Sequence, residues 1–144
     1  MKHLLALVLC LASLNAQIIG HATSYGKYCN GCQLYADPPT LGTNPRGIVV
    51  TPTTNNAIGI LGISVVRQTR QIYRISAYEV CYLHIVPISQ WMIPISITLG
   101  YTSIRLGQIP NDANLIGLRY YMQAAVNTPY APSWSNGIAL LLGR

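Results

Sequence analysis

Residues 109–126 contain the pattern that most constrains the fold of this chain. After Gly117, side chains alternate between the two sides of an expected strand: Leu118, Tyr120, Met122 and Ala124 on one, Arg119, Tyr121 and Gln123 on the other. A period of two residues is that of a β-strand with one face in a core. The tyrosines favour a strand, and Gly117 would cost a helix about 1 kcal/mol. We therefore expect a core strand here.

About eight short runs of this kind follow one another along the chain. In the clearest, Ile93, Ile95, Ile97 and Leu99 alternate with other residues, and Pro94 lacks an amide donor, which favours an edge strand or a bulge. The remaining runs cover 48–51, 57–66, 71–76, 80–86, 104–106 and 138–142. Residues 57–66 read as a long buried run, and 23–47 as loop. The pattern predicts an all-β fold, an antiparallel β-sandwich with jelly-roll or Greek-key-like order.

The N-terminal residues have the features of an export signal. Lys2 and His3 precede an apolar run over 4–14, which is the length of a signal-peptide core and too short to span a bilayer. Gly20 and Ala22 fit cleavage after Ala22, with cleavage after Ala16 as the alternative. We expect a signal peptide over 1–22, a single domain over 23–144 without a transmembrane segment, and a secreted protein.

The expected mature chain carries few charges. Without Lys2, eight basic residues face three acidic ones, so its net charge is +5. Charged residues make up 8% of the chain, against about 25% in ordinary domains. A surface with so little charge has little repulsion to keep copies apart. This composition favours self-association or attachment to a matrix, and an extracellular location makes nucleic acid an improbable partner.

Few residues could catalyse a reaction. The acids after residue 22 are Asp37, Glu79 and Asp112, of which the first precedes two prolines and the last lies in an expected turn. Glycoside hydrolysis would need two of these three to converge. His84 is the sole histidine after residue 22, and no Gly-x-Ser-x-Gly motif occurs. We therefore expect no catalytic residues, no cofactor and no enzyme activity.

Several short motifs occur in a fixed order. They are Tyr25-Gly26-Lys27-Tyr28-Cys29, Pro39-Thr40-Leu41 followed by Gly47, the hydrophobic and glycine-containing run 58–64, Cys81-Tyr82-Leu83, Ile109-Pro110-Asn111-Asp112 followed by Leu115, Gly117, Tyr121 and Gln123, and Ser135-Asn136-Gly137.

In this order the motifs resemble a small β-domain of secreted planctomycete and myxobacterial proteins, which often stands at the C-terminal end of much larger exported chains. The resemblance spans nearly all of 23–144. It implies a secreted bacterial β-sandwich, and it brings no defined biochemical role and no catalytic residues. The chain departs from the pattern in a second cysteine, Cys32, and in having no larger domain attached, which favours a free-standing subunit.

Three cysteines remain after residue 22, and in an exported chain the default is a disulfide. The resemblance places cysteines at positions 29 and 81, and Cys81 is expected to face the core, so Cys29–Cys81 is the first choice. Cys32 then stays free or forms an intermolecular bond. A Cys29–Cys32 bridge is the alternative.

Cys29, Cys32, Cys81 and His84 also have the number and spacing of ligands in a Cys₃His zinc site. Against such a site, Cys81 and His84 fall on opposite faces of a strand over 80–86, and an oxidising compartment favours the disulfide. We therefore expect no metal and interpret His84 as a surface residue.

Two groups of residues are candidates for ligand binding. Arg67, Arg70 and Arg74 form a basic cluster that fits either an acidic glycan or a solvated strand face. Tyr130 and Trp134 lie in an expected Pro-rich loop over 127–136, where they fit either stacking on a sugar or closing one end of the core.

The leading functional hypothesis is a non-enzymatic extracellular structural protein. It would form homo-oligomers or polymers, as a filament or surface-layer subunit, or attach to the cell-surface matrix, and unpaired sheet edges are the expected route of assembly. The second hypothesis is a lectin-like module that binds cell-surface polysaccharide through Tyr130, Trp134 and the arginines. The third is a zinc-stabilised binding domain.

Overall fold

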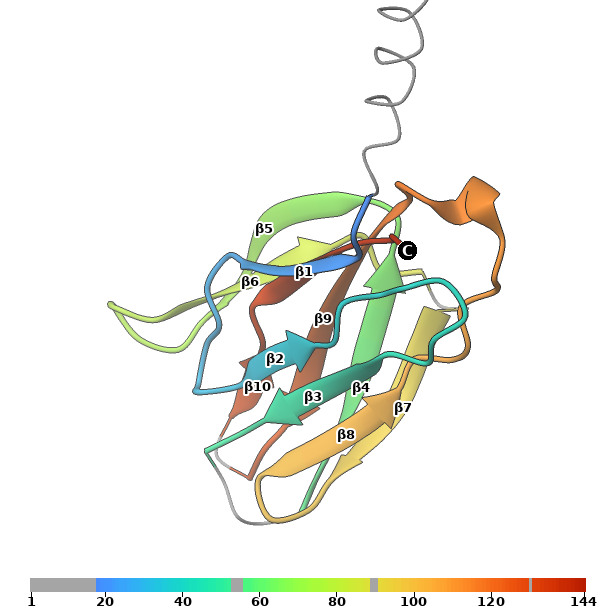
Figure 1. Ribbon diagram of the computed structural model, residues 1–144. Coiled ribbons are helices and arrows are strands. Elements are labelled where there is room, and N and C mark those ends of the chain that lie inside the picture. The colour runs from blue at the N-terminus through green and yellow to red at the C-terminus, as the bar shows by residue number, and fades with distance from the viewer. Residues whose placement is uncertain (1–17, 53–55, 89–90, 130) are drawn as a thin grey trace, which may run out of the picture.

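The computed structural model describes residues 18–52, 56–88, 91–129 and 131–144, and the elements that lie wholly within them are β-strands and the 3₁₀ turn η2. Figure 1 shows two stacked layers of strands. In chain order the elements are β1 His21–Tyr25, β2 Gln33–Ala36, β3 Arg46–Val50, β4 Ala57–Ser64, β5 Arg67–Arg74, β6 Val80–Ile85, β7 Met92–Ile97, β8 Tyr101–Arg105, the 3₁₀ turn η2 Ala113–Leu115, β9 Arg119–Asn127, β10 Pro132–Trp134 and β11 Gly137–Leu141.

The strands form two sheets and a separate hairpin. The larger sheet has the order β1-β11-β9-β4-β7, with β10 also paired to β9, and the smaller has the order β2-β3-β8. The hairpin is β5–β6, and all strand pairs named here are antiparallel. The predicted all-β antiparallel sandwich is confirmed. Strands β1, β2 and β10 lie in segments that the sequence pattern assigned to the signal peptide or to loops.

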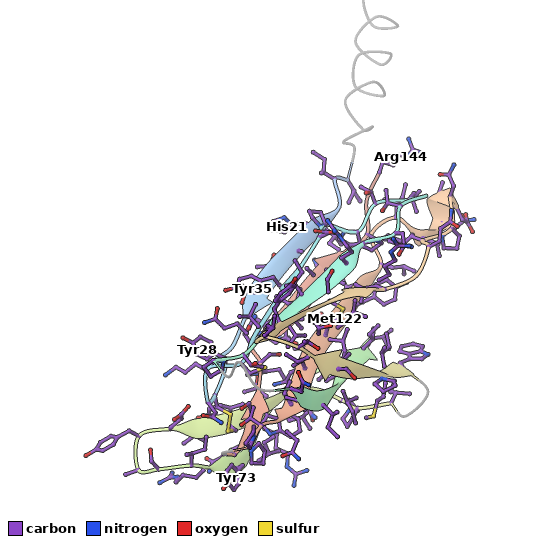
Figure 2. All side chains as sticks on the ribbon, turned by 90° about the horizontal axis from the view of Figure 1, so that it is seen from below. His21, Tyr28, Tyr35, Tyr73, Met122 and Arg144 are labelled. Atoms are coloured by element: carbon purple, nitrogen blue, oxygen red, sulfur yellow. A yellow bond between two sulfur atoms is a disulfide. The ribbon has the colours of Figure 1, made fainter. Side chains whose placement is uncertain are left out.

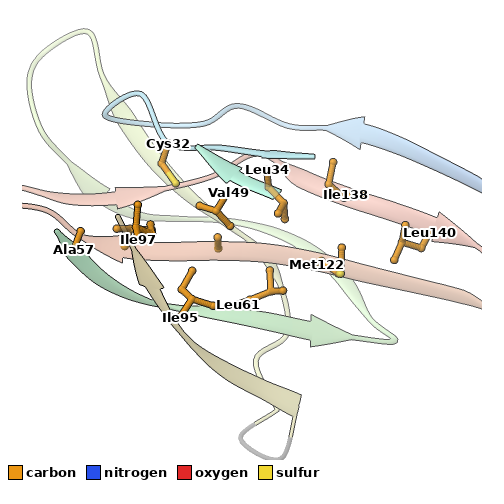
Figure 3. Close-up of a cluster of buried hydrophobic side chains, with 12 residues drawn as sticks. Cys32, Leu34, Val49, Ala57, Leu61, Ile95, Ile97, Met122, Ile138 and Leu140 are labelled. Atoms are coloured by element: carbon orange, nitrogen blue, oxygen red, sulfur yellow. The ribbon is translucent and has the colours of Figure 1, made fainter. Parts of the chain in front are cut away.

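The core lies between the two sheets (Figure 3). Leu34 and Val49 from the smaller sheet face Leu61, Met122 and Ala124 from the larger one, and all five are fully buried. A buried aliphatic side chain of this size contributes about 1.5–3 kcal/mol by leaving water. The expected inward face of the strand that became β9 is confirmed, because Met122 and Ala124 lie in this core.

Strand β7 is an edge strand of the larger sheet, as Pro94 predicted. It pairs with β4 alone in its sheet, with Pro94 opposite Ile60. The chain then crosses to the smaller sheet through Leu99 and Gly100, which both have positive φ. Two consecutive residues of that kind form a tight turn whose twist matches that of the flanking strands. The expected turn at Gly100 is therefore confirmed.

The β5–β6 hairpin forms a partial third layer on the outer face of the larger sheet. Gly62 of β4 points toward it, and a Cβ at Gly62 would lie 2.7 Å from Cδ1 of Ile85 in β6. The predicted close approach at a glycine within this run is thus confirmed. The end of the hairpin that carries Tyr73 extends away from the rest of the domain (Figure 2).

Strand β1 crosses the expected signal-peptide boundary at residue 22. His21 pairs with Leu141 and Ala22 with Leu140, and Ala22 packs against the core. No helix in the part of the chain that the structure describes has the length and hydrophobicity needed to cross a membrane.

Candidate functional site

A disulfide joins Cys29 to Cys81, as the cysteine pattern favoured. The two Cα atoms are 5.2 Å apart, and both residues are buried. Cys29 lies in the segment before β2 and Cys81 in β6, so the bond ties the hairpin to the body of the domain. The backbone N–H of Cys29 also donates to the carbonyl of Trp134 at 2.8 Å. The pairing leaves Cys32 as a thiol.

Of the two alternatives expected for Cys32, the free thiol is confirmed. The intermolecular bond is wrong, because the side chain is fully buried in the core. Burial raises the pKa of the Cys32 thiol to about 12 from an ordinary value of 9.0, because a thiolate in apolar surroundings loses its hydration. The Cys32 side chain is an apolar core residue in this fold.

We expect the Cys32 thiol to resist alkylation in the native protein. A pKa three units higher leaves about a thousandfold less thiolate near pH 8 than an unfolded cysteine has, and burial adds a steric barrier. The same shift makes the folded state less stable as the pH rises from 9 toward 12, because the unfolded chain releases the proton first. Iodoacetamide labelling followed by mass spectrometry should find one modified thiol in denaturant and none without it. Rapid labelling of the native protein would contradict this burial.

The proposed Cys₃His metal site does not form. Cys29 and Cys81 are bonded to each other, and Nε2 of His84 lies 2.9 Å from the carbonyl oxygen of Lys27. Within the described ranges, no three His, Cys, Asp or Glu side chains gather as metal ligands would.

His84 is 1% exposed, so its interpretation as a surface residue is wrong. The segment after β1 covers its ring: a Cβ at Gly26, whose φ is +69°, would overlap the imidazole. Tyr25 packs edge-on against the ring, with centroids 5.6 Å apart, and its hydroxyl donates to the His84 carbonyl at 2.9 Å. The Nδ1 atom of His84 has no hydrogen-bond partner among the described residues. Glycine at position 26 is thus required by the buried ring.

Tyr25 also contacts Arg67, one of the predicted ligand-binding residues. The guanidinium of Arg67 lies 4.2 Å from the centroid of the Tyr25 ring, a cation–π contact. Burial raises the pKa of Tyr25 to about 12, Arg67 opposes that rise, and the neighbouring Tyr121 adds to it. Arg67 therefore has a structural role against β1.

Buried amide side chains join the layers where sheet pairing stops. Gln123 of β9 accepts from the backbone N–H of His84 at 2.8 Å and donates to the carbonyls of Tyr82 and Ser135 at 2.7 and 2.8 Å. Asn136 accepts from the N–H of Leu34 at 2.9 Å and donates to the Leu34 carbonyl at 3.0 Å. Each amide substitutes for a peptide group of a neighbouring strand. Gln123 and Ser135-Asn136 belong to the ordered motifs of the sequence, and their roles here are structural.

All three arginines of the predicted basic cluster lie on β5 and are exposed. The carboxylates are occupied elsewhere: Asp37 pairs with Arg46 at 3.4 Å, Glu79 accepts from the N–H of Asn30, and Asp112 caps η2. Among the residues with described positions, the Asp37–Arg46 contact is the one ion pair. The basic charge of β5 is therefore not neutralised by this chain, and the three acids do not form a catalytic pair.

The outer face of the larger sheet is divided in two. The β5–β6 hairpin covers the half that contains Gly62, Ser64 and Gln123. The other half is uncovered and contains the outward-facing residues of three adjacent strands and the end of β10. We call it the open face; it comprises Ile58, Ile60, Pro94, Ser96, Ala125, Asn127 and Trp134.

A groove of about 760 Å³ runs over the open face, and its lining contains no charged residue. Ile58 is 68% exposed and Ile60 44% exposed, so the expectation that 57–66 is buried throughout is wrong for its outward positions. A smaller hollow of about 430 Å³ adjoins it at Asn56, Thr98 and Pro129. The combined surface is mostly apolar, is interrupted by polar residues such as Ser96 and Asn127, and carries no charge.

Trp134 lines this groove from β10 and is half-buried, so it lies in a short strand and not in the loop that the sequence predicted. Tyr130, its expected partner, lies outside the described residues. The arginines of β5 do not line the groove. The structure therefore does not bring Trp134 and the arginine cluster into one pocket.

A second apolar cavity, of about 420 Å³, lies between the segment 106–115 and the inner face of the larger sheet. It continues the core past the end of the smaller sheet, and its lining includes Trp91, Ile109, Leu115 and Leu142. Gln108 is the one amide side chain in this lining. Tyr120 is the one titratable side chain in this lining.

No protein-family model matches the chain, and no curated protein or solved structure does either.

Proposed function

We propose that this chain is a secreted, non-enzymatic structural protein that associates with copies of itself through the open face, as a subunit of an assembly at the cell surface. The observation that carries the proposal is the apolar, uncharged groove over β4, β7 and β9, with Ile58 and Ile60 exposed at its centre. Burial of such a surface against a second copy would be favourable by about 25 cal/mol per Å² of apolar area before the entropy of association is subtracted.

Association through this face is favoured over pairing at two of the free strand edges. The β7 edge contains Pro94, which cannot donate a hydrogen bond, and the β5 edge carries three arginines that would repel the same residues of a second copy. On the open face, by contrast, two copies meet no like charges. The disulfide supports the export part of the proposal, because such bonds persist in oxidising compartments.

The test is a lysine at the centre of the open face. Ile58→Lys should convert the assembly to monomers, because pairing would bury a charge without a partner. Leu118→Lys is the matched control, since Leu118 is 43% exposed and lies outside the groove. Size-exclusion chromatography with light scattering should find monomers for the first variant and wild-type mass for the second. Equal masses for all three proteins would refute the assignment of this face.

Polysaccharide binding is a second candidate, and the position of Trp134 in the wall of a groove that also contains Asn127 favours it. An indole face together with an amide side chain is suited to a sugar ring. Trp134→Ala would then release the chain from a polysaccharide affinity column while leaving its assembly mass intact. If Ile58→Lys abolishes assembly and the monomer no longer binds the column, the two activities share the groove.

A further inference from the structure

The residues just before Thr23 are part of the folded domain. His21 and Ala22 provide two of the five residue pairs between β1 and β11. Further upstream, the carbonyl of Ile18 accepts a hydrogen bond from the backbone N–H of Arg144 at 2.9 Å. Cleavage of a signal peptide after Ala22 would remove all of these contacts.

The C-terminal backbone is shaped to receive residues 18–20. A Cβ at Gly143 would overlap the backbone of Ile19 and Gly20 and would lie 2.5 Å from the carbonyl oxygen of Ile18. Gly143 does not adopt a positive φ, so the backbone conformation alone does not require glycine there. The close approach of residues 18–20 does. Gly20 shows the same packing from the other side, because a Cβ there would overlap the carbonyl oxygen of Pro39.

We infer that the signal peptide is removed after Ala16, so that the mature protein is residues 17–144 and keeps the whole of β1. A signal peptidase would hydrolyse the Ala16–Gln17 bond, with water giving its hydroxyl to the Ala16 carbonyl and a proton to the Gln17 amine. Ala16 supplies the small residue directly before the cut, and Leu14 stands where an A-x-A-like site has its second small residue. The inference rests on the export part of the proposed function.

Expression of the full chain in an exporting host tests the site directly. N-terminal sequencing and intact mass should give residues 17–144, with or without loss of ammonia from the terminal glutamine. A mature chain that starts at Thr23, or one that retains residues 1–16, would overturn the inference. Retention of 1–16 would also remove export from the proposed function. Self-association is tested separately, by measuring the molar mass of a purified chain of residues 17–144.

Gly143→Ala supplies a second test that needs no secretion. In a chain of residues 17–144, the added methyl group should lower the urea midpoint by roughly 1–2 M, whereas in a chain of residues 23–144 it should change the midpoint by less than about 0.3 M. The shorter chain without the substitution should itself unfold roughly 1–2 M earlier than the longer one.

Equal midpoints for the two chain lengths, together with a harmless Gly143→Ala in the longer one, would overturn the inference. Failure of the shorter chain to fold would support it. In that case Gly20→Ala in the longer chain is the second variant, expected to lower the midpoint through its overlap with Pro39.

Discussion

Replacement of Asn136 by alanine is expected to lower the free energy of unfolding by about 3–5 kcal/mol. The side chain satisfies both the N–H and the carbonyl of Leu34, a residue with no solvent exposure, and donates to the Ser24 hydroxyl at 2.8 Å. Alanine leaves these groups buried without partners, and each lost partner costs about 1–3 kcal/mol. Urea unfolding followed by tryptophan fluorescence measures the change.

Asn114→Ala is the matched control, because the Asn114 side chain is exposed and no described hydrogen bond uses its amide. It should change stability by less than about 0.5 kcal/mol. Asn136→Asp separates the two halves of the interaction, since a carboxylate keeps the acceptor for the Leu34 N–H and loses the donors. If Asn136→Ala and Asn114→Ala have equal stability, the amide does not join β11 to β2.

Removal of the disulfide is expected to cost about 4 kcal/mol. The bond closes a loop with a sequence separation of 52 residues, and in the chain-entropy model such a loop restricts the unfolded state by about that amount. Because the bond also anchors the hairpin to the segment before β2, the double variant Cys29→Ala/Cys81→Ala should loosen β5 and β6 first. Chemical denaturation measures the total loss, and hydrogen exchange of the β6 amides locates it.

Wild-type protein unfolded in the presence of a reductant provides the control for cavity effects, because it loses the bond and keeps both sulfur atoms. Its stability should match that of the double variant to within about 1 kcal/mol. A stability unchanged by either treatment would show that the hairpin is held without the disulfide.

The features that the sequence predicted depend on local patterns. Alternation of Ile93, Ile95 and Ile97 marks a strand with one buried face whatever its neighbours are, and Pro94 restricts that strand to an edge. Cys81 could be paired with Cys29 because its alternating strand was expected to turn it toward the core and because the family resemblance implies cysteines at both positions.

The features that it did not predict depend on contacts between distant segments. Strand β1 exists because β11, more than a hundred residues later, pairs with it, and its own residues show no β alternation. Alternation placed the side chain of His84 on the outside, and the segment carrying Gly26 then covered it. Ile58 and Gly62 both point away from the core, but the hairpin covers Gly62 and leaves Ile58 exposed. The open face therefore follows from the position of the hairpin, which local periodicity does not encode.

The molar mass of the purified chain in solution tests the central claim most directly. Sedimentation equilibrium at roughly 1–100 µM, where interfaces of ordinary size associate, should give a mass that rises with concentration to at least twice that of one chain. Ile58→Lys should remove this rise. A wild-type mass that stays at one chain over the whole range would contradict assembly through the open face.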